Sequence, residues 1–109
     1  MESELSCIEQ LIGIKDKVES IQMEGPETSS DLFCYMQETR GLLICFSNND
    51  YCDQQTAKMI GYCLQYLEES INRLKRGLTF GSAFLLKSII SMFLRNVPEE
   101  VMAECLGQT

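Results

Sequence analysis

Cysteine is the residue type with the most chemical potential in this chain of 109 residues. The sequence contains no histidine, so it lacks both the usual base for a catalytic thiolate and the commonest transition-metal ligand. No two cysteines have the C-x-x-C spacing of a zinc knuckle or a thioredoxin-like motif. We therefore expect neither catalysis nor a metal or cofactor site. The six cysteines are Cys7, Cys34, Cys45, Cys52, Cys63 and Cys105.

Disulfide formation is the other chemistry that cysteines offer. Most of these residues fall within apolar helical patterns, where a free cysteine behaves as a small buried hydrophobe. Cys45 and Cys52 differ, because they flank a predicted turn at residues 47–50 and could face each other across it. A bridge between these two cysteines and a thiol-based redox sensor both remain alternatives.

The acidic side chains do not assemble a catalytic or calcium-binding motif. Glu68 and Glu69 are adjacent on a predicted helix and point in different directions, so they do not form a carboxylate pair. The polar residues at 48–53 lack the alternate spacing, central glycine and terminal glutamate of a calcium loop. The glycines do not form a phosphate-binding motif either.

Net charge bears on the class of partner. Sixteen acidic residues against nine basic ones give a formal charge of −7, which disfavours phosphate backbones and favours basic protein partners. The cluster Arg73, Lys75 and Arg76 ends a predicted helix, where cations complement the helix dipole. We therefore expect no nucleic-acid binding, although a helical DNA-associated regulator remains an alternative.

Targeting signals are not evident in the sequence. The first four residues are acidic, unlike the basic start of a signal peptide. The longest apolar-rich stretch, residues 78–94, is interrupted by polar residues and by Lys87. We expect a cytoplasmic protein with no membrane span.

Apolar residues recur with helical period along the whole chain, which predicts an all-α fold. The expected architecture is a single domain over residues 1–109. It is a small bundle of four main helices plus a short C-terminal helix, with an antiparallel helical hairpin at residues 31–76. Gly25-Pro26, the turn at 47–50 and Gly77 separate the first four helices. The expected helices span residues 2–22, 31–47, 51–76, 82–95 and 96–106.

The third predicted helix has two non-polar stripes. One stripe recurs at steps of three and four residues, as in a coiled coil, and comprises Ala57, Ile60, Leu64, Leu67, Ile71 and Leu74. Met59, Tyr62 and Tyr66 lie on the opposite face. They either pack against the first or fifth helix or contact a partner, and tyrosine and methionine suit interfaces.

The fourth predicted helix is apolar nearly all round, so it is either central in the domain or part of an association surface. Phe84, Ile89, Met92 and Phe93 are the residues that could seal a homodimer.

Together these features predict a small cytosolic protein–protein interaction module, an adaptor or regulator that acts by helix–helix docking without catalysis. The identity of the protein partner is unknown, and a homodimer is one form that the association could take. A dedicated chaperone or immunity-type protein that sequesters one client is the main alternative. The predicted partner-binding residues are Met59, Tyr62, Tyr66, Phe84, Ile89, Met92 and Phe93.

Overall fold

The computed structural model describes residues 2–20, 28–48 and 53–97, and it confirms the all-α fold. Four helices account for nearly all of these residues: α1 (Glu2–Ser20), α2 (Thr28–Ser47), α3 (Gln54–Lys75) and α4 (Thr79–Arg95). No β-strand occurs within these three ranges. Of the predicted fifth helix at residues 96–106, residues 98–106 lie outside the described part of the chain, and residues 96 and 97 form a turn and a bend after α4.

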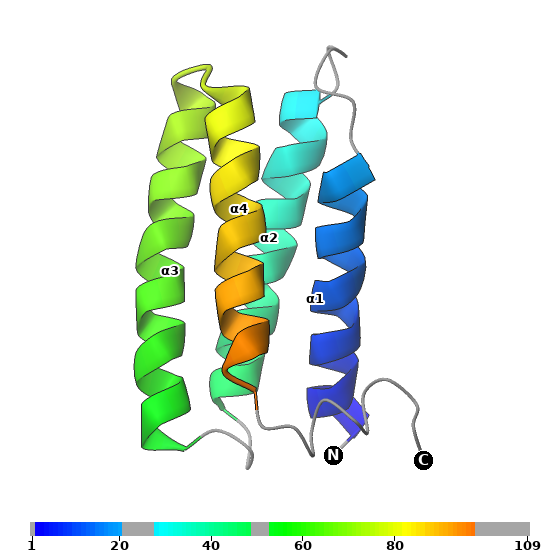
Figure 1. Ribbon diagram of the computed structural model, residues 1–109, viewed down its shortest axis with the longest axis vertical. Coiled ribbons are helices and arrows are strands. Elements are labelled where there is room, and N and C mark those ends of the chain that lie inside the picture. Colours follow the sequence, from blue (N-terminus) through cyan, green and yellow to red (C-terminus); the bar gives the residue numbers. More distant parts are fainter. Residues whose placement is uncertain (1, 21–27, 49–52, 98–109) are drawn as a thin grey trace.

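The helices run alternately up and down, so each is antiparallel to the next (Figure 1). Each packs against its two neighbours around the bundle, and α2 also contacts α4 across the centre. In contrast, the described backbones of α1 and α3 do not come close to each other. The hairpin that was predicted over residues 31–76 is formed by α2 and α3, and the whole arrangement is that of a four-helix bundle.

Two helices begin earlier than the sequence pattern predicts. The α2 helix starts at Thr28 instead of Asp31, and α4 starts at Thr79 instead of Ser82. Both extensions add residues that the apolar periodicity did not require, because helix ends depend on local hydrogen bonds more than on hydrophobic pattern. The extension of α4 places Phe80 on a helix rather than in a loop.

Side-chain capping fixes the start of α3. A carboxylate oxygen of Asp53 accepts a hydrogen bond from the Thr56 backbone N–H at 2.7 Å. This hydrogen bond lowers the pKa of Asp53, since it stabilises the ionised carboxylate. The first residue of α3 is therefore set by this cap.

A glycine reverses the chain between α3 and α4. Gly77 has a φ of +84°, the left-handed region that side chains other than glycine rarely adopt. The N–H groups of Gly77 and Leu78 donate to the carbonyl oxygens of Leu74 and Arg73, at 3.0 and 2.9 Å. These bonds end α3 and bring α4 back along it.

The core is built from one buried stripe on each helix. Phe46 of α2 and Phe93 of α4 meet edge to face, with ring centroids 5.2 Å apart. On α3 the buried stripe contains Ile60, Leu67 and Ile71 of the predicted set, whereas Leu64 and Leu74 are half-buried and Ala57 is exposed. Because α3 packs against both α2 and α4, its buried surface does not coincide with the single stripe that packing against one helix would require.

A polar contact joins α3 to α4 inside the bundle. The buried hydroxyl of Ser70 donates to the carbonyl oxygen of Ser82 at 3.0 Å. The same hydroxyl lies 3.9 Å from the Sδ of Met36. The Ser70 hydroxyl is thus satisfied although it is removed from water.

The described cysteines are of two kinds: Cys7 and Cys63 are buried, and Cys34 and Cys45 are exposed. Burial raises the pKa of Cys63 to about 11, which makes that thiol a poor nucleophile. Cys45 is not bridged, and Cys52 lies outside the described residues, so the structure gives the Cys45–Cys52 disulfide no support. The described helices include none that is long and apolar enough to span a bilayer.

Candidate docking surface

The seven predicted partner-binding residues separate into buried and exposed groups. Ile89 and Phe93 are only 1% and 0% exposed and belong to the core between α4 and its neighbours. This burial corrects the expectation that they line an association surface, since neither has an exposed face in this conformation. Met59 and Met92 are half-buried and pack against the same core. Tyr62, Tyr66 and Phe84 remain as residues that a partner could contact.

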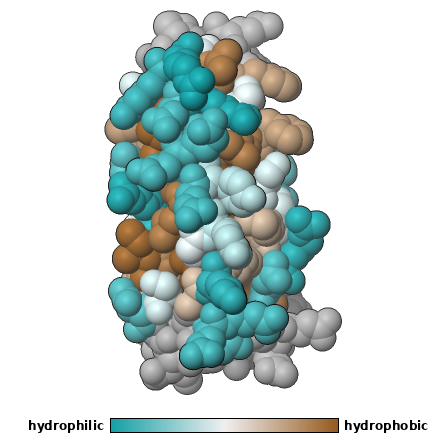
Figure 2. Space-filling model, turned by 90° about the vertical axis from the view of Figure 1, so that its left-hand side faces the viewer, coloured by the Kyte–Doolittle hydropathy of each residue, from teal (hydrophilic) through white to brown (hydrophobic). Residues whose placement is uncertain are grey.

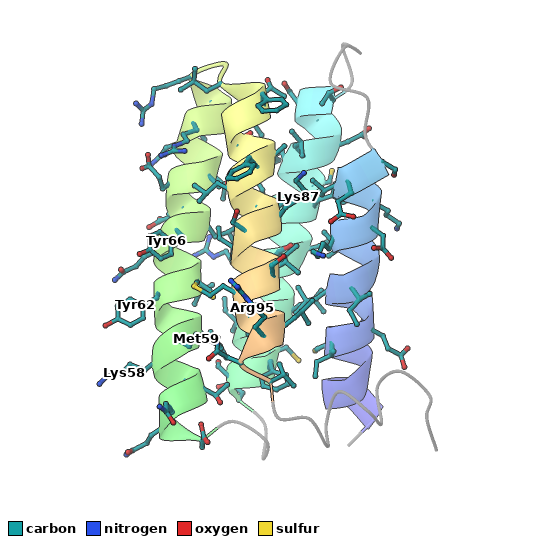
Figure 3. All side chains as sticks on the ribbon, in the orientation of Figure 1. Lys58, Met59, Tyr62, Tyr66, Lys87 and Arg95 are labelled. Carbon is teal, nitrogen blue, oxygen red and sulfur yellow. The ribbon has the colours of Figure 1, made fainter. Side chains whose placement is uncertain are left out.

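One exposed surface lies on α3, and we call Lys58, Tyr62, Gln65 and Tyr66 the α3 outer face. Tyr62 and Tyr66 are 54% and 50% exposed, and both project away from the bundle beside Lys58 (Figure 3). Because α1 does not contact α3, the first helix does not cover the tyrosines. Seen from this side, the molecule is mainly hydrophilic to neutral along its middle (Figure 2).

The second exposed surface lies on α4. Phe80 and Phe84 are one helical turn apart and are 73% and 63% exposed. At 100° per residue they share an arc of about 100° with four polar residues of the same helix. We call this set the α4 outer face: Phe80, Phe84, Lys87, Ser88, Ser91 and Arg95.

Phe80 is not among the predicted partner-binding residues, because the sequence pattern places residue 80 in the connection after the third predicted helix. Once α4 starts at Thr79, Phe80 and Phe84 form an i, i+4 pair on the side opposite the core. An earlier start of the fourth helix, at Thr79, would have revealed this pair in the sequence. In the first turn of α4 the Ser82 hydroxyl donates a hydrogen bond to the Thr79 carbonyl oxygen at 2.8 Å.

A groove runs between α1 and α4 and contains most of the α4 outer face. Its α1 wall carries Lys15 and Glu19, and its α4 wall carries Phe84, Leu94 and the polar residues of that face. Lys15 forms an ion pair with Glu19, with 3.4 Å between Nζ and Oε1. Lys87 and Arg95 form no ion pair with any residue that the structure describes. The groove thus combines an exposed aromatic ring with two unneutralised cations.

The charge of this region differs in sign from that of the whole chain. Residues 70–97 contain five basic residues and no acidic one, whereas all sixteen acidic residues lie elsewhere in the sequence. The basic cluster Arg73, Lys75 and Arg76 is therefore the beginning of a longer acid-free segment. Complementarity with the helix dipole explains that cluster alone and does not extend to Lys87 and Arg95.

The chemistry of the α4 outer face is suited to binding. It offers apolar area, two cations and two serine hydroxyls, and the Ser88 hydroxyl already donates to the Phe84 carbonyl oxygen at 3.0 Å. Within the described residues, no three histidine, cysteine or acidic side chains are grouped so that they could hold a metal ion.

Fold and surface together define the class of molecule: an up-and-down four-helix bundle with a cationic, aromatic face on its last described helix. No family model matches the chain, and neither a curated protein nor a solved structure was found to be similar to it. The site is therefore interpreted from its own geometry.

Proposed function

We propose that this chain is a small cytoplasmic protein–protein interaction module, an adaptor or regulator that docks a partner helix on the α4 outer face without catalysis. The observation that supports this proposal is the exposed pair Phe80 and Phe84. Burial of a phenylalanine side chain contributes about 1.5–3 kcal/mol, and folding of the described chain leaves most of that contribution unused at both positions. Exposed apolar groups that gather on one face are typical of association sites.

The α3 outer face supports docking less strongly. A tyrosine can keep its hydroxyl in water while its ring covers neighbouring side chains, so half-exposed tyrosines are ordinary on a helix surface. Phenylalanine has no polar group to hydrate. We therefore assign the α4 outer face as the principal surface and the α3 outer face as a secondary one.

A symmetric homodimer through the α4 outer face is disfavoured by charge. Two-fold symmetry brings the same patch of both copies together. Lys87 and Arg95 of one copy would then face the same cations of the other, and the α4 helix supplies no carboxylate to neutralise them. We therefore propose a different protein as the partner and expect a monomer in light scattering of the purified chain.

Affinity purification with matched baits tests the proposal. Three forms of the full chain are compared on extract of the source organism: the wild type, Phe80→Ser/Phe84→Ser and Tyr62→Ser/Tyr66→Ser. We expect a protein that the wild type and the tyrosine variant retain and the phenylalanine variant loses. Equal recovery by all three baits, measured by quantitative mass spectrometry, would contradict docking on the α4 outer face.

A further inference from the structure

We propose that the partner segment is an acidic amphipathic helix that lies in the groove between α1 and α4. This inference rests on the proposed function and adds the chemistry of the partner. The apolar residues of the segment pack on Phe84 and Leu94, and its carboxylates pair with Lys87 and Arg95.

The spacing of the two cations indicates the pattern expected in the partner. Lys87 and Arg95 are eight residues apart, which is about 12 Å along an α-helix at 1.5 Å per residue. On a partner helix, residues seven or eight positions apart span the same length on one face. We therefore expect two acidic residues at that separation, with an apolar residue about one turn beyond one of them, opposite Phe84.

Charge complementarity is the main argument for an acidic occupant. The α4 helix carries no acidic residue, and among the described residues the one carboxylate that lines the groove, Glu19, is paired with Lys15. The cations of α4 are therefore available to an incoming anion. This polarity is opposite to that expected from the net charge of −7, which would favour a basic partner.

The shape of the site favours a helix over a flat anionic surface. Lys87 is half-buried and lines the groove together with Lys15 and Glu19 of α1 (Figure 3). A rod-like segment that pairs with Lys87 can lie along this shallow groove and contact both helices. A lipid bilayer presents a planar surface and would contact the most exposed residues of α4, Phe80 and Phe84, whereas Lys87 is half-buried.

Selection from a random peptide library tests this inference. The full chain is immobilised and exposed to displayed random peptides of about 16 residues, long enough for roughly four helical turns. Peptides that also bind Phe84→Ser are removed. We expect the remaining peptides to be net acidic, with acidic residues seven or eight positions apart, and to bind more weakly as ionic strength rises.

Charge reversal in the groove provides the quantitative test. The affinity of a selected peptide is measured by fluorescence anisotropy for the wild type and for Lys87→Glu/Arg95→Glu. We expect the double variant to lose about tenfold or more in affinity, because like charges then face each other across the interface. The matched control, Arg40→Glu/Lys75→Glu, makes the same charge change at exposed positions of α2 and α3 that line neither the groove nor the α3 outer face, and it should alter affinity less than about threefold. Circular dichroism confirms that both variants fold.

The outcomes separate the two proposals. If Phe84-dependent peptides are enriched but are neutral or basic, docking stands and the acidic partner is wrong. If no peptide depends on Phe84, both proposals fail. An anionic membrane is the other ligand that could supply negative charge. Cosedimentation with vesicles of phosphatidylcholine and phosphatidylserine tests it. Wild-type binding to these vesicles that Lys87→Glu/Arg95→Glu abolishes, without acidic peptides being enriched, would overturn the inference in favour of a membrane.

Discussion

The two helices that meet at Gly77 carry aromatic pairs of the same spacing on their outer faces, but in different chemical settings. On α3 the pair is Tyr62 and Tyr66, within a surface that is otherwise polar. On α4 the pair is Phe80 and Phe84, on a helix whose inner face is already apolar except for Ser82. The fold uses one apolar face of each helix, so the exposed phenylalanine pair of α4 has no role in packing the described residues.

This difference shows that the apolar pattern of a helix can indicate a binding surface as well as a buried one. An amphipathic pattern such as that of α3 is accounted for by burial within the chain. A helix that is apolar on both sides is either enclosed or binds something else, and α4 is not enclosed because Phe80 and Phe84 are exposed. The presence of exposed phenylalanines on the outer face of α4 is therefore the feature that indicates a binding surface.

The largest expected effect separates the inner and outer faces of α4. Replacement Phe93→Ala removes a fully buried ring that packs on Phe46 and should lower the free energy of unfolding by about 3–5 kcal/mol. Replacement Phe84→Ala removes an exposed ring and should change it by less than about 0.5 kcal/mol. Urea denaturation of both variants gives the comparison. Similar losses would mean that Phe84 is part of the core.

The next effect compares the two outer faces in binding. Replacement Phe80→Ser/Phe84→Ser should weaken a selected acidic peptide by about 30-fold or more, since anchor residues typically contribute 2 kcal/mol or more. Replacement Tyr62→Ser/Tyr66→Ser should weaken it by less than about threefold, because α3 does not line the groove. Fluorescence anisotropy measures both changes. A larger loss for the tyrosine variant would reverse the assignment of principal and secondary surfaces.

The connection between the two helices should show a smaller effect on stability. At Gly77 an added Cβ would meet no neighbouring atom, so the cost of Gly77→Ala comes from its φ of +84° alone. We expect a loss of about 1–2 kcal/mol in the free energy of unfolding, measured by thermal and urea denaturation. Gly61→Ala within α3 is the control, and it should be neutral or stabilising because alanine favours a helix. Equal effects would show that the left-handed turn is not required.

The smallest effect concerns the different starts of α3 and α4. Of these two helices α3 has a side-chain cap and α4 has none, so Asp53→Ala should lower Tm by a few degrees at neutral pH. The lowered pKa of Asp53 means that its contribution is complete above the ordinary value of 3.8 and disappears as pH falls through the lowered pKa. The Tm difference between wild type and Asp53→Ala should therefore shrink below about pH 4. Asp53→Asn, which keeps a capping oxygen, should retain more of the stability at neutral pH, and a Tm gap independent of pH would contradict this role.

Some of this molecule could be read from residue order alone. Helical periodicity predicted four helices, Gly77 marked the end of α3, and the hairpin of α2 and α3 followed from the short turn between them. These features depend on neighbours within a few residues, through backbone conformation and the repeat of 3.6 residues per turn. The sequence also placed Tyr62 and Tyr66 on the helix face opposite the main stripe. That this face is exposed was known only from the structure.

The division of the apolar residues of α4 needed the tertiary structure. Ile89, Phe93 and Phe84 are all large apolar residues, yet the first two are buried against neighbouring helices and the third lines a groove beside α1. Which side of a helix is covered depends on contacts between residues far apart in the chain, and no local pattern encodes those contacts when a helix is apolar all round. The sequence by itself determined the helices and the sign of the charge along them. The packing of α4 between α1, α2 and α3 decided which of its rings and cations were left outside to meet another molecule.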